Sequence, residues 1–144
     1  MKNKTEFTDI IKIEKNKIQN LEKELKREFS LIERISNEMA QLDSDILNID
    51  YPSSGTFSML QQYNFAMHNM KGDIQKLSEQ RTQSGQRVNQ IRTDMKNINI
   101  ELEKFRFIED EILKERRIAI LKEESKELDE IATILYSTNR SSKS

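Results

Sequence analysis

The chain has 144 residues, of which 34% are charged and only 6% aromatic, and its formal net charge is −1. Acidic and basic residues are interleaved throughout, which argues against nucleic-acid binding, because phosphate recognition needs clustered Lys and Arg. No apolar run approaches the roughly 20 residues of a membrane-spanning helix, and the absence of cysteine excludes disulfides. This composition favours a single long, thin helical domain in the cytoplasm over a globular core.

The first predicted element is a long helix that begins near residue 5 and ends near residue 49. Its apolar residues recur at alternating steps of three and four, which is the repeat of a left-handed coiled coil. Ten of the twelve positions in this register are apolar, the exceptions being Glu14 and Glu28. The register comprises Ile11, Glu14, Ile18, Leu21, Leu25, Glu28, Ile32, Ile35, Met39, Leu42, Ile46 and Ile49.

A turn is predicted at about residues 50–57. This stretch contains the only proline, Pro52, and one of three glycines, Gly55. Proline fixes φ and glycine adopts dihedrals that other residues avoid, so both interrupt a helix. One interruption between two long helical patterns indicates a hairpin of helices.

The second predicted helix follows the turn and keeps its own register from Leu60 to Ile112. Thirteen of its sixteen positions are apolar, and the exceptions are Arg81, Ser84 and Glu109. Beyond Ile112 the alternation of threes and fours is lost, although apolar residues at helical spacing continue to Leu135. The sequence therefore predicts an all-α fold, a long antiparallel two-helix coiled-coil hairpin over residues 5–136, with a disordered tail at 137–144.

The two arms are expected to be unequal in length. Pairing outward from the turn places residues 46 back to 11 opposite residues 60 to 95, and this leaves residues 96–135 without a partner arm. An isolated amphipathic helix is marginal in water, so this segment is expected to fold back, to dimerise or to enter another protein.

Catalytic and cofactor-binding patterns are absent from the sequence. No two glycines lie close enough to form a phosphate-binding loop, and the single histidine, His68, has no second ligand within a recognisable metal motif. The acidic run Glu109–Asp110–Glu111 distributes its carboxylates around a helix and is interpreted as a solvated face. We therefore expect no enzymatic activity, no metal and no cofactor.

Two short motifs carry a resemblance to a known family. Residues 60–63 read Leu-Gln-Gln-Tyr at the start of the second arm, and residues 126–132 read Lys-Glu-Leu-Asp-Glu-Ile-Ala near its end. Their order, their spacing and the hairpin between them resemble the FliJ family of the bacterial flagellar type III export apparatus. The resemblance implies a non-enzymatic stalk and export chaperone, located at the cytoplasmic face of that apparatus and reaching the membrane only through partners.

The resemblance also implies partners and the residues that contact them. The expected partners are the hexameric export ATPase, the export gate protein and export chaperones. An alignment on Gln61 and Gln62 implies export-gate binding by Tyr63, Met67, Met70 and Ile74, with Met39 and Leu42 as counterparts on the first arm. Phe65 is added to this set because it is an aromatic residue near the turn that lies outside the apolar register. The C-terminal motif implies ATPase binding by Lys126, Leu128, Asp129, Glu130, Ile131 and Ala132.

Two alternatives remain open at this point. The injectisome stalk protein has the same architecture, and this sequence barely separates it from the flagellar one. A structural or dimerising coiled-coil tether would instead use residues 96–135 as a dimer zipper. A prefoldin-like chaperone hairpin is disfavoured because the base of the arms shows no β-hairpin pattern.

Overall fold

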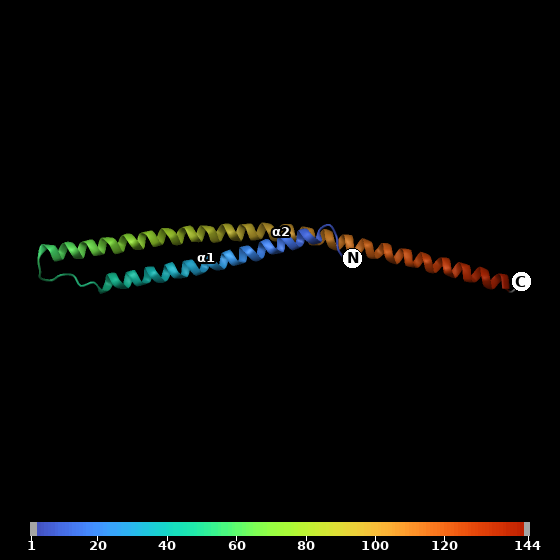
Figure 1. The fold of residues 1–144 in the computed structure, drawn as a ribbon, viewed down its shortest axis with the longest axis horizontal. Coiled ribbons are helices and arrows are strands. Elements are labelled where there is room, and N and C mark those ends of the chain that lie inside the picture. Colours follow the sequence, from blue (N-terminus) through green and yellow to red (C-terminus); the bar gives the residue numbers. More distant parts are fainter. Residues whose placement is uncertain (1–2, 143–144) are drawn as a thin grey trace. The chain divides into compact units, whose positions relative to one another are not determined.

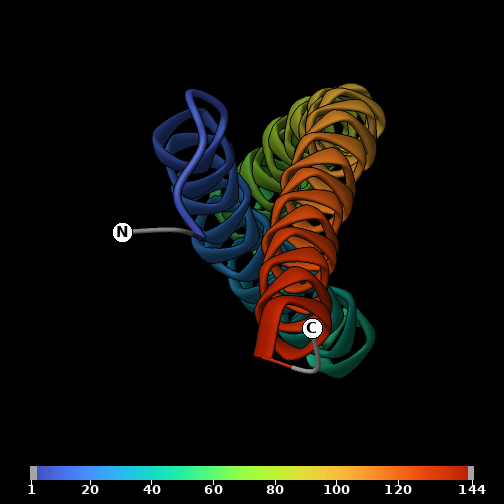
Figure 2. The ribbon, with the colours of Figure 1, turned by 90° about the vertical axis from the view of Figure 1, so that its right-hand side faces the viewer.

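The structure is a computed structural model that describes residues 3–142, and the described residues form two helices. Helix α1 spans Thr8–Asn48 and helix α2 spans Phe57–Ser142, with a loop at residues 49–56 between them. Figures 1 and 2 show the two helices lying side by side and running in opposite directions. The predicted all-α hairpin with unequal arms is confirmed.

Internal contacts divide the chain into two compact units. One unit combines residues 1–16 with residues 99–144, and the other contains residues 17–98. Each unit therefore holds a part of α1 and a part of α2, and only the second unit contains the loop.

The apolar register predicted for both arms coincides with the interface between the helices. All twelve positions of the first register, eleven in α1 and Ile49 directly after it, are buried or half-buried. So are fifteen of the sixteen α2 positions, Arg81 being the exposed exception. The least exposed apolar side chains are Ile11, Ile35, Val88, Ile91 and Leu102. A two-helix interface shields one stripe on each helix, which explains why so few residues are fully buried.

The alignment of the helices differs from the predicted pairing by about two helical turns. In the unit of residues 17–98, the predicted pairing would place residue 78 opposite Glu28. The structure instead places Arg87 there, with its Nε atom 2.8 Å from Glu28 Oε1. The shift arises because the loop is not a tight, symmetrical turn: Tyr51 packs edge-on against Tyr63, with ring centroids 5.1 Å apart.

Gly55 allows the loop to pass close to the start of α2. Its φ is +155°, and a Cβ atom at this position would lie 2.6 Å from the Sδ atom of Met59. A side chain here would adopt a backbone conformation that L-residues rarely take, and the flexible side chain of Met59 would have to move aside, so glycine is favoured at this point.

The unpaired part of α2 begins later than predicted. In the unit of residues 1–16 and 99–144, α2 is still in contact with the N-terminal residues at Phe105 and Glu109. Residues 112 and 113 are half-buried, and every residue from 114 to 140 is exposed. The prediction of an unpaired segment over residues 96–135 is wrong for its first half, because the shifted alignment carries α1 further along α2. We call residues 114–142 the α2 extension.

The C-terminal end also differs from the prediction. Helix α2 continues through residues 137–142, where the sequence predicts a disordered tail, while residues 143–144 lie outside the described residues. Thr138 donates its hydroxyl proton to the carbonyl oxygen of Ile134 at 2.9 Å. Such a bond back to the preceding turn lets threonine sit in a helix without competing for its backbone donors.

Candidate protein-binding surfaces

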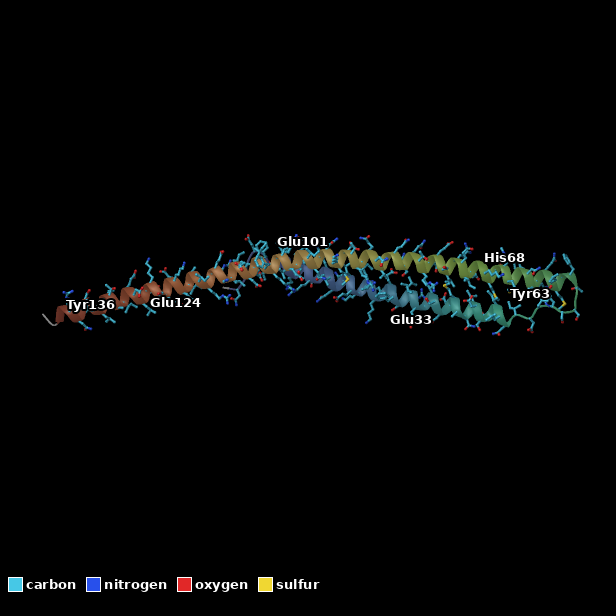
Figure 3. All side chains as sticks on the ribbon, turned by 180° about the vertical axis from the view of Figure 1, so that it is seen from behind. Glu33, Tyr63, His68, Glu101, Glu124 and Tyr136 are labelled. Atoms are coloured by element: carbon cyan, nitrogen blue, oxygen red, sulfur yellow. The ribbon has the colours of Figure 1, made fainter. Side chains whose placement is uncertain are left out.

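The residues predicted to bind the export gate lie in the unit of residues 17–98, but most of them face the other helix. Met39 and Leu42 on α1 are half-buried, as are four α2 residues: Tyr63, Met67, Met70 and Ile74. Figure 3 shows Tyr63 near the loop end of α2. Phe65 alone is exposed, at 69% of its surface. The helix interface thus accounts for six of these seven residues without a partner protein.

Phe65 is one of five large apolar residues that are exposed at and around the loop. Leu47 is 84% exposed and Phe57 is 74% exposed, values that are unusual for large apolar residues on a water-exposed helix. We call the set the turn patch. The turn patch comprises Leu47, Tyr51, Phe57, Met59 and Phe65. Leu47 was not predicted from the sequence; its position directly after Ile46, outside the register, is the signal that could have identified it.

The residues predicted to bind the ATPase all lie on the α2 extension. Each residue from Lys126 to Ala132 is exposed, and Leu128 and Ile131 expose 66% and 53% of their surfaces. Figure 3 shows Glu124 and Tyr136 on this part of α2, where no second helix runs beside it. The extension thus presents its apolar residues to solvent as a bare helix, and it has the geometry of a segment available to a partner.

The N-terminal residues contact α2 through hydrogen bonds and an aromatic pair just before the extension begins. The hydroxyl groups of Thr5 and Thr8 both donate to Glu109 Oε2, at 2.6 and 2.7 Å. Phe7 stacks on Phe105 with ring centroids 5.9 Å apart. The hydrogen bonds from Thr5 and Thr8 lower the pKa of Glu109, because they stabilise its charged form. We call residues 4–8 the strap. The hydrogen bonds from the strap explain why Glu109 occupies a position in an otherwise apolar register.

Arg116 completes the attachment of the strap, since its Nη1 atom donates to the carbonyl oxygen of Lys4 at 2.8 Å. The strap was not predicted from the sequence. The available signal was the pair of threonines three residues apart directly before the first apolar repeat, a pattern typical of a helix start.

A polar cluster interrupts the apolar interface in the unit of residues 17–98. Ser84 has no exposed surface and donates a short hydrogen bond to the carboxylate of Glu28, while Arg87 Nε donates to the other carboxylate oxygen at 2.8 Å. The bond from Arg87, followed by that from Ser84, lowers the pKa of Glu28. A small serine is needed opposite Glu28 because a larger side chain would displace the carboxylate.

The carboxylates of Glu28 and Glu109 both accept hydrogen bonds in the folded chain, so we expect acid to destabilise the hairpin. The folded-state pKa values of Glu28 and Glu109 lie below the ordinary glutamate value of about 4.3. Their contribution to the free energy of unfolding is therefore present above that pH and is lost as the pH falls through the folded-state values. We expect Glu28→Gln and Glu109→Gln to weaken this pH dependence in urea unfolding followed by circular dichroism. Glu33→Gln, an exposed control, should leave the dependence unchanged; an equal effect of all three substitutions would contradict the assignment.

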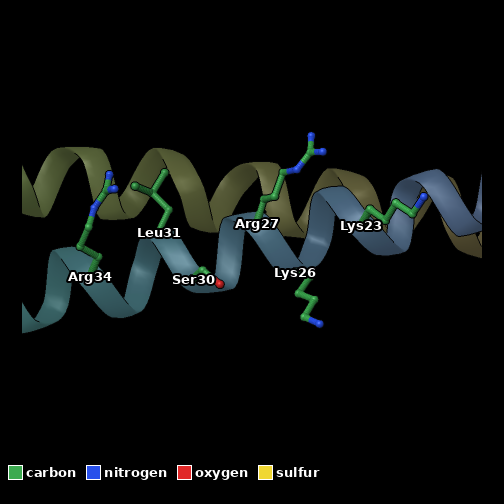
Figure 4. A pocket seen from close by; sticks show the side chains of 6 residues that line it. All are labelled: Lys23, Lys26, Arg27, Ser30, Leu31 and Arg34. Atoms are coloured by element: carbon green, nitrogen blue, oxygen red, sulfur yellow. The ribbon is translucent and has the colours of Figure 1, made fainter.

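The exposed side of α1 carries a shallow basic hollow of about 590 Å³. It is lined by Lys23, Lys26, Arg27, Ser30, Leu31 and Arg34. Figure 4 shows that these side chains diverge, with Lys26 pointing away from α2 while Leu31 and Arg34 extend toward it. Side chains that point in different directions do not converge on a small ligand, so the hollow has no geometry for small-molecule recognition.

Neither a metal site nor a membrane-spanning helix is found in the described part of the chain. No group of three or more potential metal-ligating side chains comes together within residues 3–142. No helix over the same range is long and apolar enough to cross a lipid bilayer. The turn patch and the α2 extension are exposed apolar surfaces of the described residues.

Comparison with known proteins gives one match. A family model described as flagellar FliJ protein matches residues 3–141, which is nearly the whole chain. No curated protein and no solved structure matches the chain. The match includes both helices, the loop and almost all of the α2 extension.

Proposed function

Because this chain belongs to the FliJ family and is a component of flagellar export, we propose that it serves there as a non-enzymatic stalk and export chaperone. In this proposal the α2 extension and the strap bind the hexameric export ATPase. The turn patch docks on the export gate protein and also binds export chaperones. The chain acts at the cytoplasmic face of the export apparatus.

The observation that carries this proposal is the bare α2 extension. Every residue from 114 to 140 is exposed, although large apolar residues recur there at helical spacing. A helix of this kind gains stability only when a partner covers its apolar side. A ring of subunits with a mixed apolar and basic lining would cover all sides of a single helix, which fits the exposed acidic residues between the apolar ones.

The test is a binding measurement between the full chain and the purified hexameric export ATPase, with ATP hydrolysis as a second readout. The proposal expects a specific complex and faster ATP hydrolysis. If neither the flagellar ATPase nor its injectisome counterpart is bound or stimulated, the stalk assignment fails and a structural coiled-coil tether becomes the better account.

The turn patch provides a separate prediction about the export gate. We expect Phe65→Ser to weaken binding to the cytoplasmic part of the gate protein by roughly tenfold or more, because truncating an aromatic hot-spot residue costs about 2 kcal/mol or more and each 1.4 kcal/mol corresponds to a factor of ten. Phe65 is 69% exposed, so the helices should remain intact. Isothermal titration calorimetry measures the affinity and circular dichroism the helicity.

A matched control replaces an exposed aromatic residue outside the turn patch. Phe107→Ser removes a side chain that is 67% exposed in the other unit. It should leave gate binding unchanged. If Phe65→Ser and Phe57→Ser both bind the gate like the unaltered chain, the turn patch is not the docking surface.

A further inference from the structure

The residues of the α2 extension are grouped by chemical type along the helix axis. Residues 114–117 contain three basic residues and one acidic residue, and residues 118–121 are all apolar. Residues 122–130 contain five acidic residues and two basic ones, and residues 131–136 contain five apolar residues and one threonine. The extension therefore presents four successive levels, which we call the basic level, the first apolar level, the acidic level and the second apolar level.

At each apolar level the side chains reach every side of the helix. Successive residues of an α-helix point about 100° apart, so four in a row surround its axis. Ile118, Ala119, Ile120 and Leu121 are all exposed, and so are residues 131–136. A groove or a single second helix covers only one side of a helix and would leave the remaining apolar side chains of each level in water.

The charged levels also reach more than one side. Arg116 points about 200° away from Lys114 and about 100° away from Arg117, so these three cations surround the axis. In the acidic level, Glu124 and Asp129 point about 140° apart. Leu128 is the one apolar side chain of the acidic level. The chemistry of the extension thus changes with the position along the axis and much less with the direction around it.

We propose that the partner of the extension is a protein channel that encloses the helix and that fixes its depth but not its rotation about its own axis. The channel has an acidic mouth, an apolar band, a basic band and a second apolar band, in the order of the four levels. A shift along the axis would place charged levels against apolar bands, which costs free energy. A rotation would leave each level beside the same band.

The strap marks the mouth of the channel. Arg116 Nη1 donates to the carbonyl oxygen of Lys4, so the strap lies against α2 at the basic level. A helix with its side chains is about 10–12 Å wide, and the strap adds to the width at this level. Residues 118–136 beyond it are all exposed and form about 27 Å of bare helix. A channel that fits closely around one helix therefore ends at the strap.

This enclosure rests on the proposed function, because the hexameric export ATPase supplies the channel. The two can still fail separately. An ATPase complex that covers only one side of the extension would overturn the enclosure and leave the proposed function intact. The absence of any complex would overturn both.

The first test measures accessibility around the first apolar level, in a chain that has no cysteine of its own. Full-length chains with Ile118→Cys, Ala119→Cys, Ile120→Cys or Leu121→Cys react with a maleimide, with and without the purified ATPase. At an ATPase concentration about ten times the dissociation constant, the reaction should slow roughly tenfold at all four positions, because about one chain in ten is then free. Glu79→Cys, at an exposed position of the other unit, should react equally under both conditions.

One-sided binding would give a different pattern of protection. Ile118 and Leu121 are three residues apart and share a side of the helix, whereas Ala119 and Ile120 point elsewhere. Protection of Ile118→Cys and Leu121→Cys alone, with the other two variants still reactive, would overturn the enclosure. Circular dichroism confirms that each variant retains its helices.

The second test addresses the order of the charged levels. Lys114→Glu combined with Arg117→Glu places acid at an acidic mouth and should weaken the affinity for the ATPase roughly tenfold or more. Glu127→Lys combined with Glu130→Lys should do the same at the basic band. Lys71→Glu combined with Lys76→Glu makes the first charge change at exposed positions of the other unit and should leave the affinity unchanged. Equal affinities of all three double variants would overturn the assigned order of bands.

Discussion

Deletion of residues 122–144 is expected to abolish binding to the hexameric export ATPase and the stimulation of its ATP hydrolysis. The deletion removes most of the α2 extension, including Leu128 and Ile131, which expose 66% and 53% of their surfaces. Loss of several apolar contacts should lower the affinity by roughly 100-fold or more, since each 1.4 kcal/mol corresponds to a factor of ten. Surface plasmon resonance measures the affinity, and a coupled assay measures hydrolysis.

The shortened chain should still form its hairpin. The strap contacts at Phe105, Glu109 and Arg116 precede the deletion, and residues 17–98 form a unit of their own. A shorter deletion, of residues 137–144, retains the predicted ATPase-binding residues and serves as the control. Full ATPase affinity after deletion of residues 122–144 would place the binding site elsewhere on the chain.

Ile35→Asp is expected to destabilise the hairpin severely. Ile35 exposes 2% of its surface in the interface between α1 and α2. Aspartate would leave both a cavity and an unpaired carboxylate there, at a cost of about 4–5 kcal/mol. This is a large part of the stability of an ordinary domain, so the urea midpoint should fall sharply and turn-patch binding should be lost with the fold.

The matched control makes the same change at an exposed isoleucine of the same helix. Ile13 exposes 54% of its surface, so Ile13→Asp should lower the free energy of unfolding by about 1 kcal/mol or less. Urea unfolding followed by circular dichroism measures both variants. Equal effects at the two positions would contradict the assignment of Ile35 to the core of the interface.

Sequence periodicity was sufficient to identify which side of each helix is covered. The three-four repeat is a local property, because residues three and four apart share a helix side whatever the partner is. It therefore located Ile35 and Val88 in the interface, and even Glu28 and Ser84, which are polar. Periodicity does not determine which turn of α1 meets which turn of α2, because each heptad resembles the next. That alignment depends on the loop, where Tyr51 packs on Tyr63, and the predicted pairing was wrong by about two turns.

A candidate surface could be predicted from the sequence only where its exposure follows from the unequal lengths of the two helices. An arm longer than its partner must leave a bare end, and the α2 extension is such an end, although it begins at residue 114 instead of residue 96. The strap depends on long-range contacts of Thr5 and Thr8 with Glu109. The two threonines indicate a helix start, but a single sequence does not show that they pair with Glu109. Tyr63, Met67 and Met70 fall on the register, and the structure places them in the interface; their role in binding the gate stays a prediction.

The cluster of Glu28, Ser84 and Arg87 has a mechanical consequence. Apolar heptads alone would let one helix slide along the other by seven residues with little change in packing. Such a slide would put Leu77 or Ile91 where Ser84 stands and would leave the carboxylate of Glu28 facing a hydrocarbon side chain. The cost of that mismatch locks the two helices of this unit against axial slippage. A push or pull along one helix of this unit is thereby carried to the other.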